Sequence, residues 1–144
     1  MTVHLIAACG RRGQIGRAGD LPWRGDPDLE AVMKMDLAGF QRLTMGGVVI
    51  LGRRTARGMP RLEGRCVYEW AGSDPAEVIE TCGQEWPGRP IWIAGGAHTY
   101  RTFAPFVDGL KLISAIPYDS APEEDRDHAF FPFDAYGFRW GGAA

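Results

Sequence analysis

Several features that would assign a protein to a class at once are scarce in this sequence. Its three cysteines are scattered singly along 144 residues and form no CxxC pair. This excludes a disulfide framework and fits a reducing compartment, so we expect a cytoplasmic protein. Its three histidines are too far apart in the sequence to indicate a metal site, and we expect no bound metal.

A dominant charge and long apolar runs are also lacking. The 16 Lys and Arg residues nearly balance the 18 Asp and Glu residues, which leaves a net charge of -2. No positive field therefore directs the chain to nucleic acid or to acidic membranes, and we expect neither as a partner. The apolar segment 3–9 is too short to span a membrane and lacks the basic region of a signal peptide, so it is interpreted as a strand.

What the sequence does contain is typical of a soluble globular domain, which we expect to cover residues 1–144. Hydrophobic residues make up 45% and charged residues 24%. Runs that are apolar at nearly every position alternate with helical patterns, which predicts a mostly parallel α/β sheet. The expected strands are 3–9, 47–52, 65–70, 90–96 and 110–116. Helices are expected to begin near Pro27, at Asp74 and after residue 96, and the polar stretch 120–128 is expected to be a loop.

One acidic residue lies on the apolar face of a predicted helix. At a step of about 100° per residue, five apolar side chains fall within about 60° of Asp36, namely Leu29, Val32, Met33, Phe40 and Leu43. An unpaired buried carboxylate is costly, and it acquires either a partner or a raised pKa. Asp36 is therefore either a structural residue that caps backbone groups or an acid that faces a pocket for a ligand with paired N–H donors.

Three segments at the ends of expected strands favour a nucleotide ligand, although the GxGxxG fingerprint is absent. The glycine-rich segment 10–23 is interpreted as a long mobile loop. Arg53 and Arg54 follow a strand at an expected helix start, which suits either a phosphate or a solvated basic turn. Gly95 and Gly96 separate a strand from a helix, which suits either a pyrophosphate or a tight turn. Open α/β sheets bind ligands at the carboxyl ends of their strands, where all three segments are expected.

Taken in order, these segments resemble the dihydrofolate reductase family. The matching motifs are LIAACGRRGQIGRAGDLPW, DLAGFQRLT, VVILGRRT, LEGRCV, IAGGAHTYRTF, LKLISAI and FFP, and together they cover most of the chain. The resemblance implies a mostly parallel central β-sheet flanked by helices. It also implies NADPH-dependent reduction of 7,8-dihydrofolate to 5,6,7,8-tetrahydrofolate, with hydride transfer to C6 and protonation at N5. The protein is then expected to be a monomer whose partners are dihydrofolate and antifolate inhibitors.

The resemblance also assigns roles to individual residues. Catalytic roles fall to Asp36, Leu21, Trp23 and Tyr100. Substrate binding falls to Ile6, Ala7, Asp36, Leu37, Phe40, Met59, Arg65 and Ser114, with Arg65 on the carboxylate of the substrate's glutamate tail. Cofactor binding falls to Ala8, Ile15, Gly16, Gly19, Asp20, Gly52, Arg53, Arg54, Thr55, Gly95, Gly96, Ala97, His98, Thr99 and Tyr100. The Gly95–Gly96 peptide bond is expected to be cis.

Two acids compete for the catalytic position. Asp28 fits when the count starts from Trp23, and Asp36 fits when it runs back from FQRLT. The helical wheel favours Asp36, because its side chain faces the apolar side and that of Asp28 does not. This choice requires added turns at the start of the helix.

The sequence departs from the family in several places. Ala56 stands where a large aromatic residue is common, and Glu69 lies near the expected site of the 2′-phosphate of NADPH. The chain ends soon after YGFRW, so we expect the C-terminal antiparallel edge strand to be shortened or missing. The chain is then a compact natural version, as from a phage or other minimal genome, or a truncated one. Two rival functions stay open: a pyrimidine reductase of riboflavin synthesis with the same fold, against which Asp36 and Arg65 argue, and a non-catalytic folate- or nucleotide-binding relative.

Overall fold

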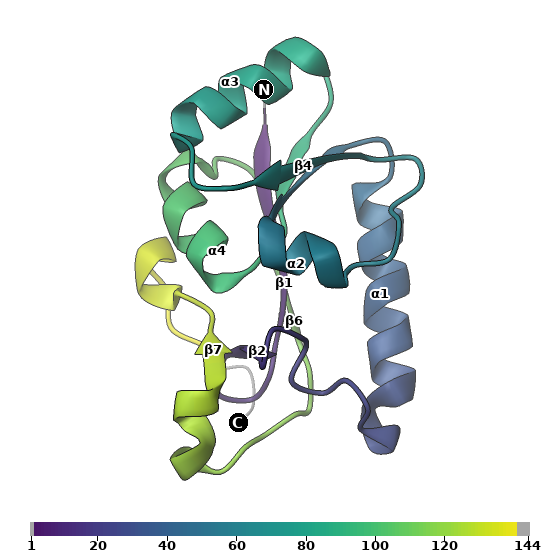
Figure 1. Cartoon of the computed structure of the whole chain (residues 1–144), viewed down its shortest axis with the longest axis vertical. Helices are drawn as coiled ribbons and strands as arrows, with labels where there is room; N and C mark the ends of the chain where they lie inside the picture. The colour runs from purple at the N-terminus through teal and green to yellow at the C-terminus, as the bar shows by residue number, and fades with distance from the viewer. Residues whose placement is uncertain (1, 141–144) are drawn as a thin grey trace.

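The computed structural model describes residues 2–140, and its centre is a five-stranded parallel β-sheet (Figure 1). The strands are β1 (Val3–Cys9), β3 (Val48–Gly52), β4 (Cys66–Trp70), β5 (Ile91–Ile93) and β6 (Lys111–Ala115). They lie in the order β4-β3-β5-β1-β6, so β5 inserts between β3 and β1. The predicted fold class is confirmed, and the expected strand ranges agree with the observed ones to within three residues at each end.

Helices cover both faces of the sheet. The helices α3 (Pro75–Glu85) and α4 (Ala97–Phe103) pack on the face formed by Val48 and Ile50, while α1 (Glu30–Thr44) and α2 (Arg53–Gly58) pack on the face formed by Val49 and Leu51. Alternate residues of a strand point to opposite faces, so a strand covered on both sides is apolar throughout, as β3 is. As predicted, Asp74 caps α3, and its carboxylate accepts a hydrogen bond from the backbone N–H of Ala76 at 3.2 Å.

The helix that carries Asp36 begins with added turns, as the choice of that acid requires. A single 3₁₀ turn, η1 (Pro27–Leu29), is capped by Asp26 and leads directly into α1. Asp28 is exposed in this turn, at the start of the helical segment, where an acidic side chain is favoured by the helix dipole. Asp36 follows in the second turn of α1.

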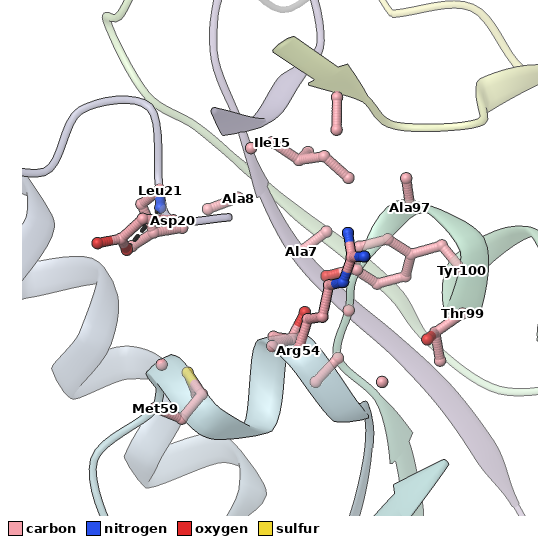
Figure 2. Close-up of a pocket in the computed structure, with 18 of the residues that line it drawn as sticks. Ala7, Ala8, Ile15, Asp20, Leu21, Arg54, Met59, Ala97, Thr99 and Tyr100 are labelled. Carbon is pink, nitrogen blue, oxygen red and sulfur yellow. Dashed lines mark hydrogen bonds between the residues drawn. The ribbon is translucent and has the colours of Figure 1, made fainter. Parts of the chain in front are cut away.

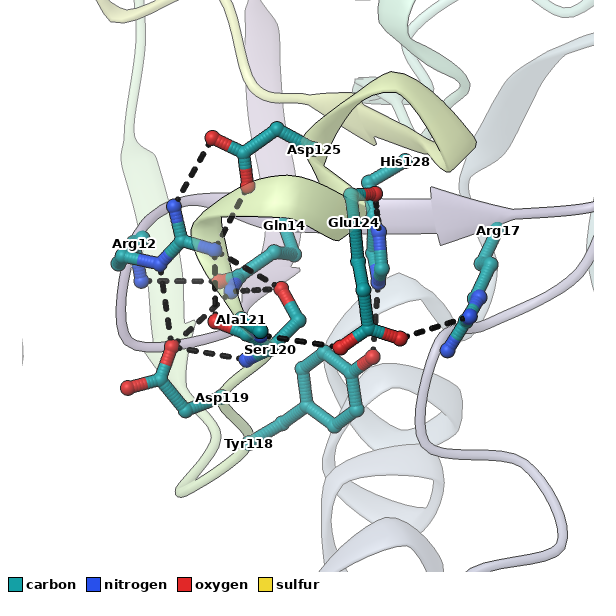
Figure 3. A network of polar contacts seen from close by, with 10 residues as sticks. All are labelled: Arg12, Gln14, Arg17, Tyr118, Asp119, Ser120, Ala121, Glu124, Asp125 and His128. Carbon is teal, nitrogen blue, oxygen red and sulfur yellow. Dashed lines mark hydrogen bonds and ion pairs between the residues drawn. The ribbon is translucent and has the colours of Figure 1, made fainter.

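The segment 10–23, predicted as a loop, contains a short strand, and a second strand begins at the last residue of the predicted loop 120–128. β2 (Gln14–Arg17) pairs antiparallel with β7 (His128–Phe130), and β7 is preceded by a 3₁₀ helix, η3 (Pro122–Asp127). Each strand is short and pairs with a segment far away in the sequence, so neither has a local pattern that predicts it. Polar contacts also join the segment around β2 to the segment before β7. Arg12 donates to Asp125 at 2.7 Å and to Asp119 at 3.1 Å, and Arg17 donates to Glu124 at 3.0 Å (Figure 3).

The end of the described chain is short. After β7 the described chain contains only the 3₁₀ turn η4 (Phe133–Tyr136) and a few residues that pack on the core. Earlier in the chain, another 3₁₀ turn, η2 (Ala104–Phe106), follows α4 and precedes β6. Within residues 2–140 no strand pairs with the outer side of β6, so the predicted shortening of the antiparallel edge is confirmed. The terminal sequence 141–144 lies outside the described residues. No helix in the described part of the chain is long and apolar enough to cross a membrane.

Candidate active site

A cavity of about 1110 Å³ opens at the carboxyl ends of β1, β3 and β5. It is lined from β1, from the segment around β2, from α1 and α2, and from the turn that leads into α4 (Figure 2). Gly52 at the end of β3 donates its backbone N–H to the carbonyl oxygen of Gly95 at 2.7 Å, so the ends of β3 and β5 are held together at the floor of the cavity. This is the position where open α/β sheets bind ligands.

Asp36 lies in this cavity. Its side chain is half-buried, and burial raises the pKa of its carboxyl group above the ordinary value, while hydrogen bonding from Ser114 on β6 offsets part of the rise. Ser114 lines the cavity as well, whereas the competing acid Asp28 is not among the described residues that line it. The cavity therefore holds a carboxylate with a raised proton affinity and one hydroxyl neighbour.

Tyr100 lies at the back of the cavity, on α4. Its hydroxyl group donates to the carbonyl oxygen of Ile6 on β1 at 2.9 Å. Burial is the main cause that raises the pKa of Tyr100 well above its ordinary value, and the negative charge of Asp36 adds a smaller contribution. Tyr100 is therefore a neutral residue whose hydroxyl is held by β1.

The Gly95–Gly96 peptide bond is cis, as the resemblance predicts. Glycine is also required nearby, where backbone segments and side chains of neighbouring elements approach closely. A Cβ atom at Gly52 would lie 2.7 Å from the Thr99 hydroxyl oxygen, and one at Gly96 would lie 3.2 Å from that of Thr55. Only glycine fits the first of these sites without a shift of its neighbour. The ends of β3 and β5 therefore pack closely against the starts of α2 and α4, and all three glycines line the cavity.

The far end of the cavity carries cations and an aromatic residue. Arg53 and Arg54 begin α2 and are exposed, and their side chains make no hydrogen bond or ion pair within residues 2–140; Arg54 extends from α2 in Figure 2. Trp70, at the end of β4, is buried and lies against His98 with ring centroids 5.1 Å apart. This end can therefore accept an anion beside a flat ring.

The structure gathers nearly all the predicted site residues around this cavity. Those that line it are Ile6, Ala7, Ala8, Ile15, Gly16, Gly19, Asp20, Leu21, Asp36, Leu37, Phe40, Gly52, Arg53, Arg54, Thr55, Met59, Gly95, Gly96, Ala97, His98, Thr99, Tyr100 and Ser114. Trp23 and Arg65 are not among the described residues that line it. Trp23 is buried with Leu29 and Tyr118, and Arg65 lines a smaller cavity of about 310 Å³ behind α2.

Comparison with known proteins identifies relatives over most of the chain. Residues 2–67 match the family model described as dihydrofolate reductase. Dihydromethanopterin reductase of Methylorubrum extorquens is 33% identical over 127 residues, which cover 86% of this chain and 87% of that protein. Dihydrofolate reductase type 8 of Escherichia coli is 32% identical over 128 residues, 76% of this chain and 72% of the relative. The chain belongs to the dihydrofolate reductase family.

Dihydrofolate reductase of Mycobacterium tuberculosis is a further relative, 32% identical over 119 residues that cover 76% of this chain and 69% of that protein. Members of the dihydrofolate reductase family are oxidoreductases that use NADPH, and this chain is an oxidoreductase of that family. The cavity is lined by residues from several of the motifs that resemble the family, including Leu21, Asp36 and Gly95.

Some cavity residues were missed by the resemblance to dihydrofolate reductases. On α1 these are Met35, Gly39, Arg42 and Leu43; at the end of β4 and just after it they are Trp70, Ala71 and Gly72; around β7 they are Asp127, His128 and Ala129. The helical wheel carried a signal for Leu43, which falls on the same side as Asp36. The residues around β7 carried none, because β7 pairs with β2, which lies far away in the sequence.

The raised pKa of Asp36 has a consequence for stability. The folded protein holds this proton more tightly than the unfolded chain, so the wild type loses stability as pH rises from the ordinary aspartate pKa through the raised one. We expect Asp36→Asn to remove this loss, so that the Tm of the variant relative to the wild type increases with pH across that window and is constant above it. Thermal unfolding across the acidic range measures the difference, with Asp28→Asn as the control at an exposed acid. A variant Tm that falls relative to the wild type as pH rises would contradict the assignment.

Proposed function

We propose that this protein reduces the pterin ring of 7,8-dihydrofolate to that of 5,6,7,8-tetrahydrofolate, with NADPH as the reductant. The observation that carries the proposal is Asp36, an acid with a raised pKa that lines the cavity together with the apolar side chains of Leu37 and Phe40. A dihydropterin presents a 2-amino group and a ring N–H side by side. A half-buried carboxylate can accept both hydrogen bonds, and charge-assisted bonds of this kind are strong.

Asp36 has two tasks in this proposal. It orients the pterin through the paired hydrogen bonds, and its raised proton affinity promotes protonation at N5. Because N5 accepts a proton, positive charge builds up next to C6, which then becomes the acceptor for hydride. Positioned proton handling of this kind contributes about 10²–10⁴-fold to rate.

The residues around the glycine turn fit NADPH. Gly52, Gly95 and Gly96 line the cavity without side chains of their own, which suits the close approach of a pyrophosphate, and Arg53 and Arg54 provide unpaired guanidinium groups for phosphate. When bound, NADPH supplies the hydride that C6 receives. The chain's own contribution is to bind the two molecules side by side, and its apolar walls at Ile15 and Leu21 limit the access of water to the reacting atoms.

A second substrate, dihydromethanopterin, is favoured by two observations. The relative from Methylorubrum extorquens is named a dihydromethanopterin reductase and aligns over 87% of its own length. In addition, Arg65, which the resemblance assigns to the glutamate carboxylate, donates from Nη1 to the carbonyl oxygen of Gln41 at 2.7 Å and faces the smaller cavity. The two substrates share the dihydropterin ring and differ in the tail, so the chemistry assigned to Asp36 applies to both.

A spectrophotometric assay with NADPH and each dihydropterin tests the proposal. We expect consumption of NADPH that depends on the dihydropterin and yields the tetrahydropterin. The ratio of kcat/KM between dihydrofolate and dihydromethanopterin then identifies the preferred substrate. Binding of both pterins without turnover of either would favour the non-catalytic alternative, and turnover of a phosphoribosyl pyrimidine instead would favour the riboflavin-pathway reaction.

A further inference from the structure

The segment that carries Leu21 into the cavity wall begins with a tight turn. Arg17 and Asp20 exchange two backbone hydrogen bonds, of 2.8 and 3.0 Å, across the two residues between them. These two residues, Ala18 and Gly19, have positive φ angles of 52° and 81°, as a type I′ turn requires. A positive φ is unfavourable for alanine, so contacts around the turn have to hold it in this conformation.

One carboxylate oxygen joins Leu21 to Arg24, a cavity residue to which the resemblance assigns no role. The backbone N–H of Leu21 donates to Oδ1 of Asp20 at 2.7 Å (Figure 2). The Nε atom of Arg24 donates to the same oxygen at 2.6 Å, and its backbone N–H donates to the carbonyl oxygen of Leu21 at 3.2 Å. Arg24 therefore holds both backbone polar groups of Leu21, one directly and one through Asp20.

These contacts fix where the side chain of Leu21 lies. Leu21 is half-buried against the apolar cluster around Trp23, as is Ala8 of β1, and both residues line the cavity. The side chains of Arg24 and Asp20 are 46% and 48% exposed, so their ion pair contributes little to the stability of the whole domain. Its effect is local, because it orients the carboxylate that accepts the Leu21 N–H.

We propose that Arg24 is a positioning residue for hydride transfer, and that it acts through Asp20 to hold Leu21 on the cavity wall. In this position the apolar side chain of Leu21 limits the access of water to the reacting atoms. Without Arg24, the carboxylate of Asp20 is free to turn towards water, and Leu21 loses its fixed geometry. The inference rests on the proposed function, because it requires hydride transfer beside Leu21.

Amide hydrogen exchange, followed by NMR on the protein without ligands, tests the contact itself. The Leu21 N–H should exchange about five-fold faster in Arg24→Ala, because its acceptor is no longer held in place. Arg24→Lys keeps a cationic donor and should restore most of the protection. The matched control is Lys34→Ala, which removes another exposed ion pair at i,i+4, with Glu30 on α1, and should keep the wild-type rate.

Single-turnover kinetics test the consequence for the reaction. The complex with NADPH is mixed with saturating 7,8-dihydrofolate, and in parallel with dihydromethanopterin, and NADPH deuterated at the transferable position identifies the hydride step. This step should be about five-fold slower in Arg24→Ala, the upper end for one exposed ion pair, while the Kd values of both ligands stay as in the wild type. High salt should slow the wild type towards the variant and leave the variant unchanged.

A double variant tests whether Arg24 acts through Asp20. Arg24→Ala should slow the hydride step no further in an Asp20→Ala background, because both changes remove the same chain of hydrogen bonds. Lys34→Ala should keep the wild-type rate here as well. Arg24→Lys should recover most of the rate together with the protection of the Leu21 N–H.

The outcomes separate the positioning role from the proposed function. If Arg24→Ala leaves the Leu21 exchange rate or the hydride step unchanged, or if its effect adds to that of Asp20→Ala, the positioning role is overturned while the reductase remains. If the wild type transfers no hydride to either dihydropterin, the proposed function fails, and the role of Arg24 in hydride transfer fails with it.

Discussion

Replacing Asp36 with asparagine should lower kcat at neutral pH by about 10²–10⁴-fold, the usual contribution of a positioned proton-handling group. The amide has nearly the same size and still lines the cavity, so the fold should be kept. It cannot accept both N–H groups of a dihydropterin as a charged pair, and it cannot promote protonation at N5. The loss should therefore appear mainly in kcat, measured by steady-state turnover of dihydrofolate with NADPH.

Two controls make this result specific. Activity of Asp36→Asn should recover in part at low pH, where the substrate becomes protonated in solution. Asp28→Asn should behave as the wild type, because Asp28 is exposed in η1 and is not among the described residues that line the cavity. If Asp28→Asn lost activity while Asp36→Asn stayed fully active, Asp36 would have a structural role.

The second large effect concerns the cofactor. We expect kcat/KM to be about two decades higher with NADPH than with NADH. The 2′-phosphate carries nearly two negative charges, and two charge-assisted contacts from Arg53 and Arg54 contribute about 1.5–3 kcal/mol each. The exposed carboxylate of Glu69 opposes this by under about 1 kcal/mol. Arg54→Ala should remove most of the preference, and Glu69→Gln should increase it slightly.

The control for this prediction lies on the same helix. Arg57 is exposed on α2 but is not among the described residues that line the cavity, so Arg57→Ala should keep the preference for NADPH. The preference should shrink as salt concentration rises, because exposed phosphate contacts are screened. Equal use of NADH and NADPH, together with an inert Arg54→Ala, would show that the arginine pair is only a solvated turn.

The fold was predictable where the apolar pattern is strong. β1 and β3 are apolar at nearly every position because helices cover both faces of the sheet, and α3 has an aspartate cap followed by proline. β2 and β7 were missed for a physical reason. Each is short, and its partner lies at the other end of the chain, so neither has a local pattern that predicts a strand.

The site was predictable to a similar degree. Asp36 could be found because a carboxylate in an apolar stripe contradicts the pattern around it, and the structure places it in the cavity with Ser114 beside it. The position of Arg65 could not be found in this way. Its neighbours in the sequence do not indicate that its guanidinium group bonds the end of α1, which depends on how the loop before β4 folds.

Isotope transfer tests the central claim most directly. The protein is given 7,8-dihydrofolate, and in parallel dihydromethanopterin, together with NADPH deuterated at the transferable position of the nicotinamide, and the products are analysed by mass spectrometry and NMR. We expect one deuterium at C6 of the tetrahydropterin, formed at a rate that falls steeply in Asp36→Asn and recovers in part at low pH. Product without deuterium at C6, or deuterium transfer that is equally fast in Asp36→Asn at neutral pH, would contradict it.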